Sequence, residues 1–164
     1  MIDRQTPLNI IDSKISKSDN SRHRTSPIEY IVIHVSASGG TAKNVIRWLS
    51  DTDKPVLVDY LVEQDKIYQL NDSDKYFPWS IGIGARSKEP INNGNIISVM
   101  LMSDPSGRVV LNSTVDYAQR LVHDLCIKYN IPNDRVLRFT DVSPRHSTGI
   151  FNNEDIWYDF KKWI

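Results

Sequence analysis

The run Tyr30-Ile31-Val32-Ile33, ended by His34, decides the fold. It is short, apolar without interruption and rich in β-branched residues, which is the pattern of a strand buried on both faces of a sheet. Residues 96–102, Ile-Ile-Ser-Val-Met-Leu-Met, have the same character and predict a second strand of this kind. Strands buried in this way occur in sheets that helices cover on both sides.

Strand and helix patterns alternate along the rest of the chain. In order, we expect a short helix after Thr41, strands over 56–62 and 66–70 joined by a tight turn, a helix over about 114–129, a short strand over 136–139 and a terminal helix over 155–163. This interleaving predicts an α/β fold, a single domain with a central mixed β-sheet of about five strands flanked by helices.

The domain is expected to span residues 29–164. Residues 1–28 hold few large apolar side chains and have a centre rich in serine and charged residues. We expect them to form an N-terminal arm that is partly flexible or lies on the body of the domain.

The charges of the 164 residues balance, with 20 Lys and Arg against 20 Asp and Glu and a pI of about 6.9. Because this balance gives no attraction to a bulk polyanion, we expect no nucleic-acid partner. The single cysteine, Cys126, excludes an internal disulfide and a paired-cysteine zinc ribbon. The apolar runs are too short for insertion into a membrane. The first residues lack the pattern of a secretion signal, so we expect a cytoplasmic location on synthesis.

Three stretches carry a resemblance to a known family. Residues 31–38, Ile-Val-Ile-His-Val-Ser-Ala-Ser, resemble the strand with the first zinc ligand in N-acetylmuramoyl-L-alanine amidases of the phage-lysozyme and peptidoglycan-recognition-protein superfamily. Residues 58–62 and 65–70 look like the second and third strands of that fold. Residues 136–144 are similar to the loop that brings the remaining ligands to the metal. The resemblance implies an amidase-like domain from about residue 29 onward.

In that family a zinc ion, held by two histidines and a cysteine or aspartate, activates the water that cuts the amide between muramic acid and L-alanine. His34 matches the first ligand. The second ligand falls on Phe139, and the third falls on Ser147 or, in members with a longer loop, on Gly149. A phenyl ring cannot coordinate a metal. The resemblance therefore implies a retained scaffold with its zinc ligands replaced, and we expect no zinc or other cofactor.

The other functional positions of the family are changed as well. The lysine that stabilises the oxyanion in some members falls on Arg145, and the glutamate of the central strand falls on Met100. The tyrosine or glutamate used in proton transfer falls on Val58. The histidine of the family's Trp-His-Ala-Gly stretch falls on Ser80, which follows Trp79. We therefore expect no catalytic residue in this chain.

Residues expected around the former zinc position are candidates for binding a ligand. They are His34, Asp59, Trp79, Ser80, Arg145 and His146. His34 is interpreted as a histidine retained inside the pocket by a hydrogen bond. Because Asp59 is expected on a strand beside His34, a cluster of His34, Asp59 and His146 offers an alternative metal site. Trp79 is expected to border the groove, either as a ligand contact or as a hydrophobic plug.

Asp59 interrupts the otherwise apolar or aromatic residues 56–62. An ionised carboxylate without a partner inside a sheet costs several kcal/mol, so it must be paired or lie at a pocket edge. One hypothesis is an ion pair of Asp59 with His34 or Arg145 at the position of the zinc. The alternative is that Asp59 marks the exposed face of an edge strand.

The resemblance implies a catalytically inactive amidase-like binding protein of phage origin. Its expected partner is peptidoglycan or a muropeptide, or else a phage or host protein on which it docks, including a virion assembly. After synthesis in the cytoplasm it would be virion-associated or released to the cell wall. The alternative function is an active zinc-dependent N-acetylmuramoyl-L-alanine amidase, endolysin-like, that uses non-standard ligands.

Overall fold

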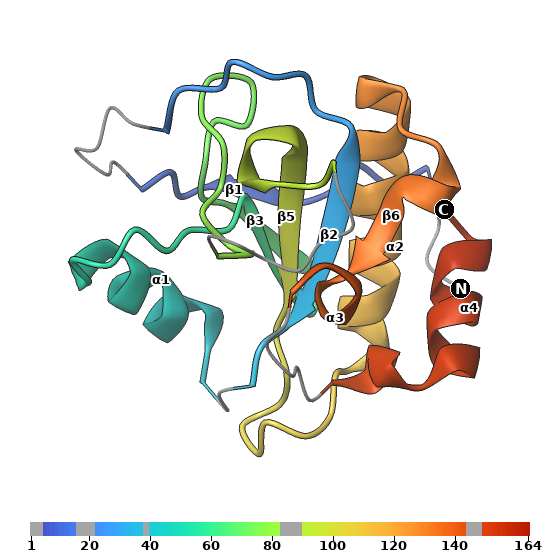
Figure 1. Ribbon diagram of the computed structural model, residues 1–164. Helices are drawn as coiled ribbons and strands as arrows, with labels where there is room; N and C mark the ends of the chain where they lie inside the picture. Colours follow the sequence, from blue (N-terminus) through green and yellow to red (C-terminus); the bar gives the residue numbers. More distant parts are fainter. Residues whose placement is uncertain (1–4, 16–21, 38–39, 83–89, 144–148) are drawn as a thin grey trace.

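The computed structural model describes residues 5–15, 22–37, 40–82, 90–143 and 149–164. Its strands are β1 (Ile10–Asp12), β2 (Tyr30–Val35), β3 (Tyr60–Glu63), β4 (Lys66–Gln69), β5 (Ile96–Leu101) and β6 (Val136–Arg138). Its helices are α1 (Ala42–Asp51), α2 (Asn112–Tyr129), α3 (Phe139–Val142) and α4 (Glu154–Lys162). The predicted elements occur in the predicted order (Figure 1). Strand β1 and helix α3 were not predicted, and Phe139, expected to end the last strand, begins α3 instead. None of the described helices is both long enough and apolar enough to cross a bilayer.

The six strands form one sheet in the order β1-β4-β3-β5-β2-β6. Strands β3 and β4 pair antiparallel, and the other neighbouring strands of this sheet pair parallel. The predicted α/β domain with a central mixed sheet is confirmed, with six strands instead of about five. The additional strand is β1, which belongs to the predicted arm and joins the edge of the sheet beside β4.

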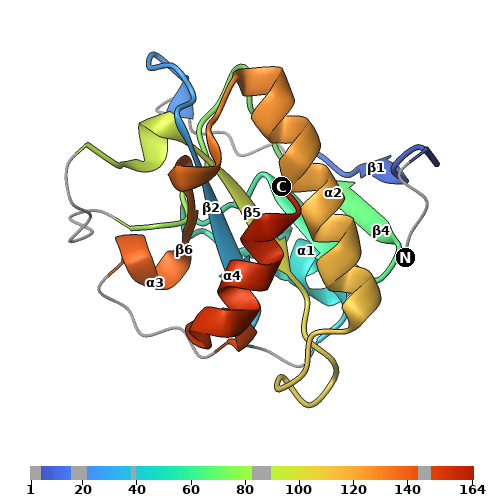
Figure 2. The same cartoon turned by 90° about the vertical axis from the view of Figure 1, so that its right-hand side faces the viewer.

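Side chains that alternate along β2 divide between two faces of the sheet. Ile31 and Ile33 enter the main apolar core, which α2 and α4 cover. Figure 2 shows these two helices in front of one face of the sheet. Val32 packs on the opposite side, where α3 contributes Val142. We call this second side the site face, because His34 contacts α3 there.

Helix α1 lies over the β3 and β4 end of the site face, and capping bonds hold its start. The Thr41 hydroxyl accepts from the Asn44 amide at 3.3 Å, as expected for an N-cap threonine. The Glu63 carboxylate accepts from the Ala42 amide at 2.8 Å. Because Glu63 ends β3, this bond fixes the first turn of the helix to the sheet. An anionic group at a helix N-terminus also interacts favourably with the helix dipole.

Arg24 fastens the predicted arm to the domain. Its guanidinium donates to the backbone carbonyls of Ser73 at 2.7 Å, Gly94 at 2.6 Å, Ile96 at 3.1 Å and Tyr76 at 3.3 Å. These carbonyls come from the segment that follows β4, from the turn before β5 and from the first residue of β5. The described part of the arm therefore lies on the body, while residues 1–4 and 16–21 of the arm are outside the described residues.

We expect Arg24→Ala to lower the free energy of unfolding by about 2–4 kcal/mol, because the substitution leaves several half-buried carbonyls without their charged donor. Arg108→Ala removes an exposed arginine from a turn and should change stability by less than about 0.5 kcal/mol. Urea denaturation of both variants measures the difference. Equal losses for the two variants would show that the arm contributes nothing through Arg24.

Candidate functional site

His34 occupies the site face near the end of β2. Its side chain is buried, with 6% of its surface exposed. The imidazole Nε2 lies 3.0 Å from the Ser98 hydroxyl of β5. The ring of Phe139 packs beside it, with 4.7 Å between ring centroids and 37° between the planes. The sequence interpretation of His34 as a hydrogen-bonded histidine inside the fold agrees with this geometry.

The parallel pairing of β2 with β6 brings Phe139 to His34. Ile33 lies opposite Arg138 in this register, so the next residue of each chain segment falls at the same level. Phe139 then begins α3, whose first turn is held by Arg138 and Asp141: the Arg138 amide donates to the Asp141 carboxylate at 2.9 Å. The two positions that the resemblance assigns to zinc ligands are therefore adjacent, and one of them holds a phenyl ring.

Burial lowers the pKa of His34 from 6.5 to about 3. Among the described residues no charged group contributes to that shift, and a pKa this low leaves the imidazole neutral at ordinary pH. Met100, at the position of the family's glutamate, is the β5 neighbour of His34 in the sheet register. The side chains of Met100 and Phe139 offer no group that can transfer a proton to or from a substrate at this place.

Asp59 is fully buried one residue before β3, and three donors bind its carboxylate. The Asn71 amide and the Ser73 hydroxyl donate to Oδ1 at 2.8 and 2.7 Å, and the Ser98 backbone amide donates to Oδ2 at 2.8 Å. Desolvation raises the pKa of Asp59, while these three bonds and the nearby charge of Arg24 act in the opposite direction. The carboxylate is thus a buried acceptor satisfied mainly by neutral donors.

The expectations for Asp59 need correction. Strand β5 lies between β3 and β2, so Asp59 is not on the strand beside His34. Within the described part of the chain, Ser98 connects the two residues: its amide binds Asp59 and its hydroxyl binds His34. A direct ion pair of Asp59 with His34 is therefore wrong, and so is an exposed edge position. Arg145, the other proposed partner, is outside the described residues.

Trp79 and Ser80 lie in the segment between β4 and β5. Among the described contacts, none joins either residue to the imidazole of His34. Trp79 is half-buried and exchanges two backbone hydrogen bonds with Leu57, of 3.0 and 3.2 Å. The Ser80 amide donates to the Asn93 side chain at 3.0 Å. The Ser80 hydroxyl is buried and has no hydrogen-bond partner among the described residues. Such an orphaned hydroxyl is an unmet hydrogen-bonding capacity.

The remaining predicted site residues come from one loop. Arg145 and His146, together with Ser147, are outside the described residues. Gly149, the alternative third-ligand position, is described: a Cβ atom there would lie 3.0 Å from the Cβ of Val35. A side chain at residue 149 would therefore press on the end of β2.

The donor set in the described part of this site does not fit a catalytic zinc. Such an ion takes three protein ligands, usually imidazole, carboxylate or thiolate, and keeps one position for water. Over residues 5–15, 22–37, 40–82, 90–143 and 149–164, no three His, Cys, Asp or Glu side chains gather in an arrangement that could hold a metal. Among the described residues, His34 has the hydroxyl of Ser98, the ring of Phe139 and, in the sheet register, Met100 as neighbours.

Sequence reasoning missed Ser98, Asn71 and Ser73 as parts of this site. Ser98 is the one polar residue inside the apolar run of β5, and that interruption was an available signal. Asn71 and Ser73 lie in a polar loop in which nothing distinguishes them from their neighbours. Their role depends on the fold, which returns the loop after β4 to the buried carboxylate.

The low pKa of His34 predicts a loss of stability in acid. In metal-free protein the unfolded chain takes up a proton near pH 6.5, whereas the folded chain does so only near pH 3. The contribution of His34 is therefore complete above about pH 6.5 and is lost as the pH falls toward 3, by about 2–3 kcal/mol at about pH 4.5. His34→Gln keeps an amide that can bond Ser98 and removes this titration. Urea denaturation across this range should show a weaker pH dependence for His34→Gln; parallel curves would contradict the assignment.

Substitution of Asp59 should lower the stability of the fold, and the loss should be larger when more hydrogen-bond donors are left unpaired. We expect Asp59→Ala to lower the free energy of unfolding by about 3–5 kcal/mol and Asp59→Asn by about 1–3 kcal/mol, since an amide nitrogen would face a donor. Asp159→Asn, at an exposed position of α4, is the matched control and should be nearly neutral. Thermal or urea unfolding gives the comparison. An Asp59→Asn variant as stable as the control would refute the three-donor description.

Comparison with known proteins agrees with the sequence resemblance. The family model described as N-acetylmuramoyl-L-alanine amidase matches residues 24–159. Among solved structures, a mutant endolysin from Bacillus subtilis superposes with a TM-score of 0.78 at 23% identity, covering 96% of this chain and 99% of that one. The catalytic domain of XlyA superposes with a TM-score of 0.73 at 24% identity, with coverages of 96% and 99%.

A Staphylococcus aureus hydrolase, AmiA, in complex with its ligand superposes with a TM-score of 0.72 at 15% identity, covering 96% of this chain and 82% of that one. At these identities the superpositions show a shared fold. No curated protein matches the chain by sequence. The family model covers most of the chain, from Arg24 in the anchored arm to Asp159 in α4. The chain belongs to the N-acetylmuramoyl-L-alanine amidase family.

Proposed function

We propose that this member of the amidase family binds peptidoglycan fragments at the site face without hydrolysing them. The observation that carries the proposal is the ring of Phe139 packed on His34, where the resemblance places a second zinc-binding imidazole. Family membership supports peptidoglycan as the ligand. To meet that ligand the chain would have to reach the cell wall after its synthesis, on a virion or by release from the cell.

Loss of the catalytic ion is the central part of this proposal. Phe139 contributes an apolar surface with no lone pair, and its contact with the imidazole is worth about 0.5–1.5 kcal/mol of packing. The Nε2 atom of His34 is engaged by Ser98. Met100 lies beside His34 in the register and cannot act as an acid or base. Each of these features favours a stable apolar contact over the activation of water.

The same geometry supports binding. The bond from Ser98 fixes the orientation of the imidazole, and Asp59 in turn fixes the backbone of Ser98. The Nδ1 atom of His34 makes no hydrogen bond among the described residues. A neutral, oriented imidazole can exchange a hydrogen bond with an amide or hydroxyl group of a muropeptide. Trp79, half-buried in the segment before β5, supplies an aromatic surface for a sugar or peptide.

Hydrolysis is the second candidate function, and the family match over residues 24–159 is the observation that favours it. A zinc ion would then need ligands from the loop of residues 144–148, such as His146, to join His34. An active chain would hold the metal in stoichiometric amount and would release soluble fragments from cell walls. A protein-docking module would do neither and would also ignore insoluble peptidoglycan.

Three measurements on the purified chain test the proposal: sedimentation with insoluble peptidoglycan, release of dye from labelled walls, and metal content. We expect co-sedimentation, no dye release and less than about 0.1 zinc per chain, because a site without three ligands binds zinc weakly. Trp79→Ala should weaken wall binding by about fivefold or more, as loss of an aromatic contact does. Trp163→Ala, at a site with 55% exposure beyond α4, is the matched control.

A gain-of-site variant checks the alignment itself. Phe139→His combined with Ser147→Cys should acquire close to one zinc per chain, whereas Phe139→Leu combined with Ser147→Cys should not. Stoichiometric zinc in the unaltered chain, with dye release that a chelator abolishes, would overturn the proposal in favour of hydrolysis. A chain that stays in the supernatant with walls would overturn the binding function.

A further inference from the structure

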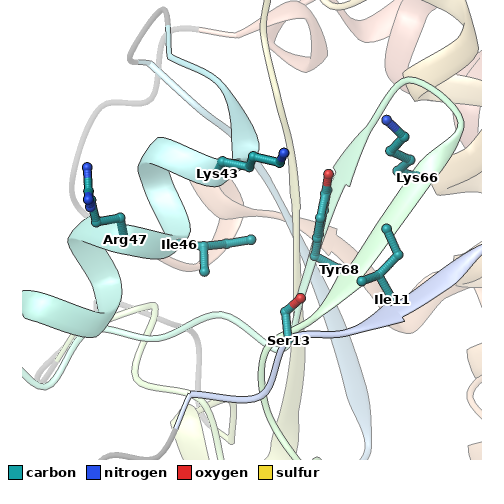
Figure 3. A pocket seen from close by; sticks show the side chains of 7 residues that line it. All are labelled: Ile11, Ser13, Lys43, Ile46, Arg47, Lys66 and Tyr68. Atoms are coloured by element: carbon teal, nitrogen blue, oxygen red, sulfur yellow. The ribbon is translucent and has the colours of Figure 1, made fainter.

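A concave site lies at the opposite end of the sheet from His34. It is a pocket of about 540 Å³ lined by residues of β1, α1 and β4 and by Ser13 after β1 (Figure 3). Its lining residues are Ile11, Ser13, Lys43, Ile46, Arg47, Lys66 and Tyr68. Strands β3 and β5 separate β4 from the strand that carries His34, so this pocket is distinct from the site proposed to bind peptidoglycan. Its volume is in the range of small-ligand sites, about 300–1,000 Å³.

Among the described residues the lining carries three cations and no carboxylate. Lys43 and Arg47 come from successive turns of α1, and Lys66 begins β4. None of the three makes an ion pair within the described part of the chain. Glu63 faces Lys66 in the β3–β4 register, but its carboxylate accepts the amide of Ala42 at the start of α1. The local charge is therefore positive in a chain whose net charge is zero.

Tyr68 places a hydroxyl among these cations. Tyr68 is buried, with 6% of its surface exposed. Its hydroxyl has no hydrogen-bond partner among the described residues. Figure 3 shows the Lys43 side chain directed toward Tyr68, with Lys66 on the other side of the tyrosine. The hydroxyl of Ser13 lies below them. Donors from three separate segments thus surround a space whose remaining walls, Ile11 and Ile46, are apolar.

We propose that this pocket binds the phosphate group of an organic phosphate. Three cations without an ion-pair partner in the described part of the chain match a group that carries a charge of about −1.5 to −2 better than they match a single carboxylate. Lysine ammonium groups bind phosphate as point charges, and hydroxyl donors complete the shell of its oxygens. Ile11 and Ile46 provide the surface against which the carbon part of the ligand packs.

Arg47 extends the site along α1. It lies one helical turn from Lys43, and in Figure 3 its guanidinium is directed away from the other cations. Lys43, Lys66 and Tyr68 therefore form the inner part of the site, and Arg47 is placed for a second anionic group. The same phosphate chemistry can come from a free small molecule or from the repeating units of a phosphate polymer, and the contribution of Arg47 separates these two sources.

Calorimetric titration with glycerol 3-phosphate tests the inner site, with glycerate and glycerol as a carboxylate and a neutral comparison. We expect saturable binding of one glycerol 3-phosphate per chain, weaker binding of glycerate and none of glycerol. Lys43→Gln and Lys66→Gln should each weaken binding about tenfold, and Tyr68→Phe by a smaller factor. Lys162→Gln, on the exposed face of α4, should bind like the unaltered chain.

A second titration uses poly(glycerol phosphate). If the polymer is the source of the phosphate group, Arg47→Gln should weaken binding of the polymer more than binding of glycerol 3-phosphate. Binding of the polymer alone would still support the phosphate site, provided that Lys43→Gln weakens it. Failure of both probes, equal binding of glycerate, or identical affinities in Lys43→Gln and Lys162→Gln would overturn the proposal. Circular dichroism checks that each variant is folded. Because the readout is phosphate binding, failure here leaves the proposal for His34 unaffected.

Discussion

The carboxylate of Asp59, buried just before the start of β3, is the constraint on which the rest of the site depends. A buried charge is tolerated only where donors surround it, and here the loop after β4 and the backbone of β5 supply them. The backbone of Ser98 is held by Asp59, and its hydroxyl in turn bonds the imidazole of His34. Arg24 binds the carbonyl of Ser73, so the N-terminal segment is held by the same loop. One buried acceptor thus organises segments that are far apart in sequence.

Parallel register, rather than the chemistry of the side chains, brings the site positions together. Pairing of β2 with β5 and β6 places Met100 and Phe139 beside His34 whether or not those residues could hold a metal. Ile31, Ile33 and their core partners on the other face determine that register. The scaffold can therefore persist when the residues at these positions change, and the chain shares its fold with an endolysin at 23% identity.

The strands and helices with a strong hydrophobic pattern could be predicted from the sequence. The order of the strands within the sheet could not. The apolar runs of β2 and β5 and the stripe of α2 are visible along the chain, whereas β1 has three residues in a polar segment and shows no periodicity. Strand order is set by tertiary pairing, so the position of β5 between β3 and β2 could not be read from local pattern. That order is the reason that Asp59 meets Ser98 instead of His34.

The edge strand β1 carries a consequence for the order of assembly. Its parallel partner, β4, belongs to the local β3–β4 hairpin, while Ile10 and Ile67 come together only by closing a long stretch of chain. Loop closure makes the pairing of β1 with β4 entropically more costly than the local hairpin. Because β1 contributes Ile11 to one wall and Ser13 follows directly, the cationic pocket is complete only when β1 is paired with β4. A ligand bound in this pocket would contact β1, α1 and β4 together and would stabilise the pairing of the N-terminal strand with the sheet.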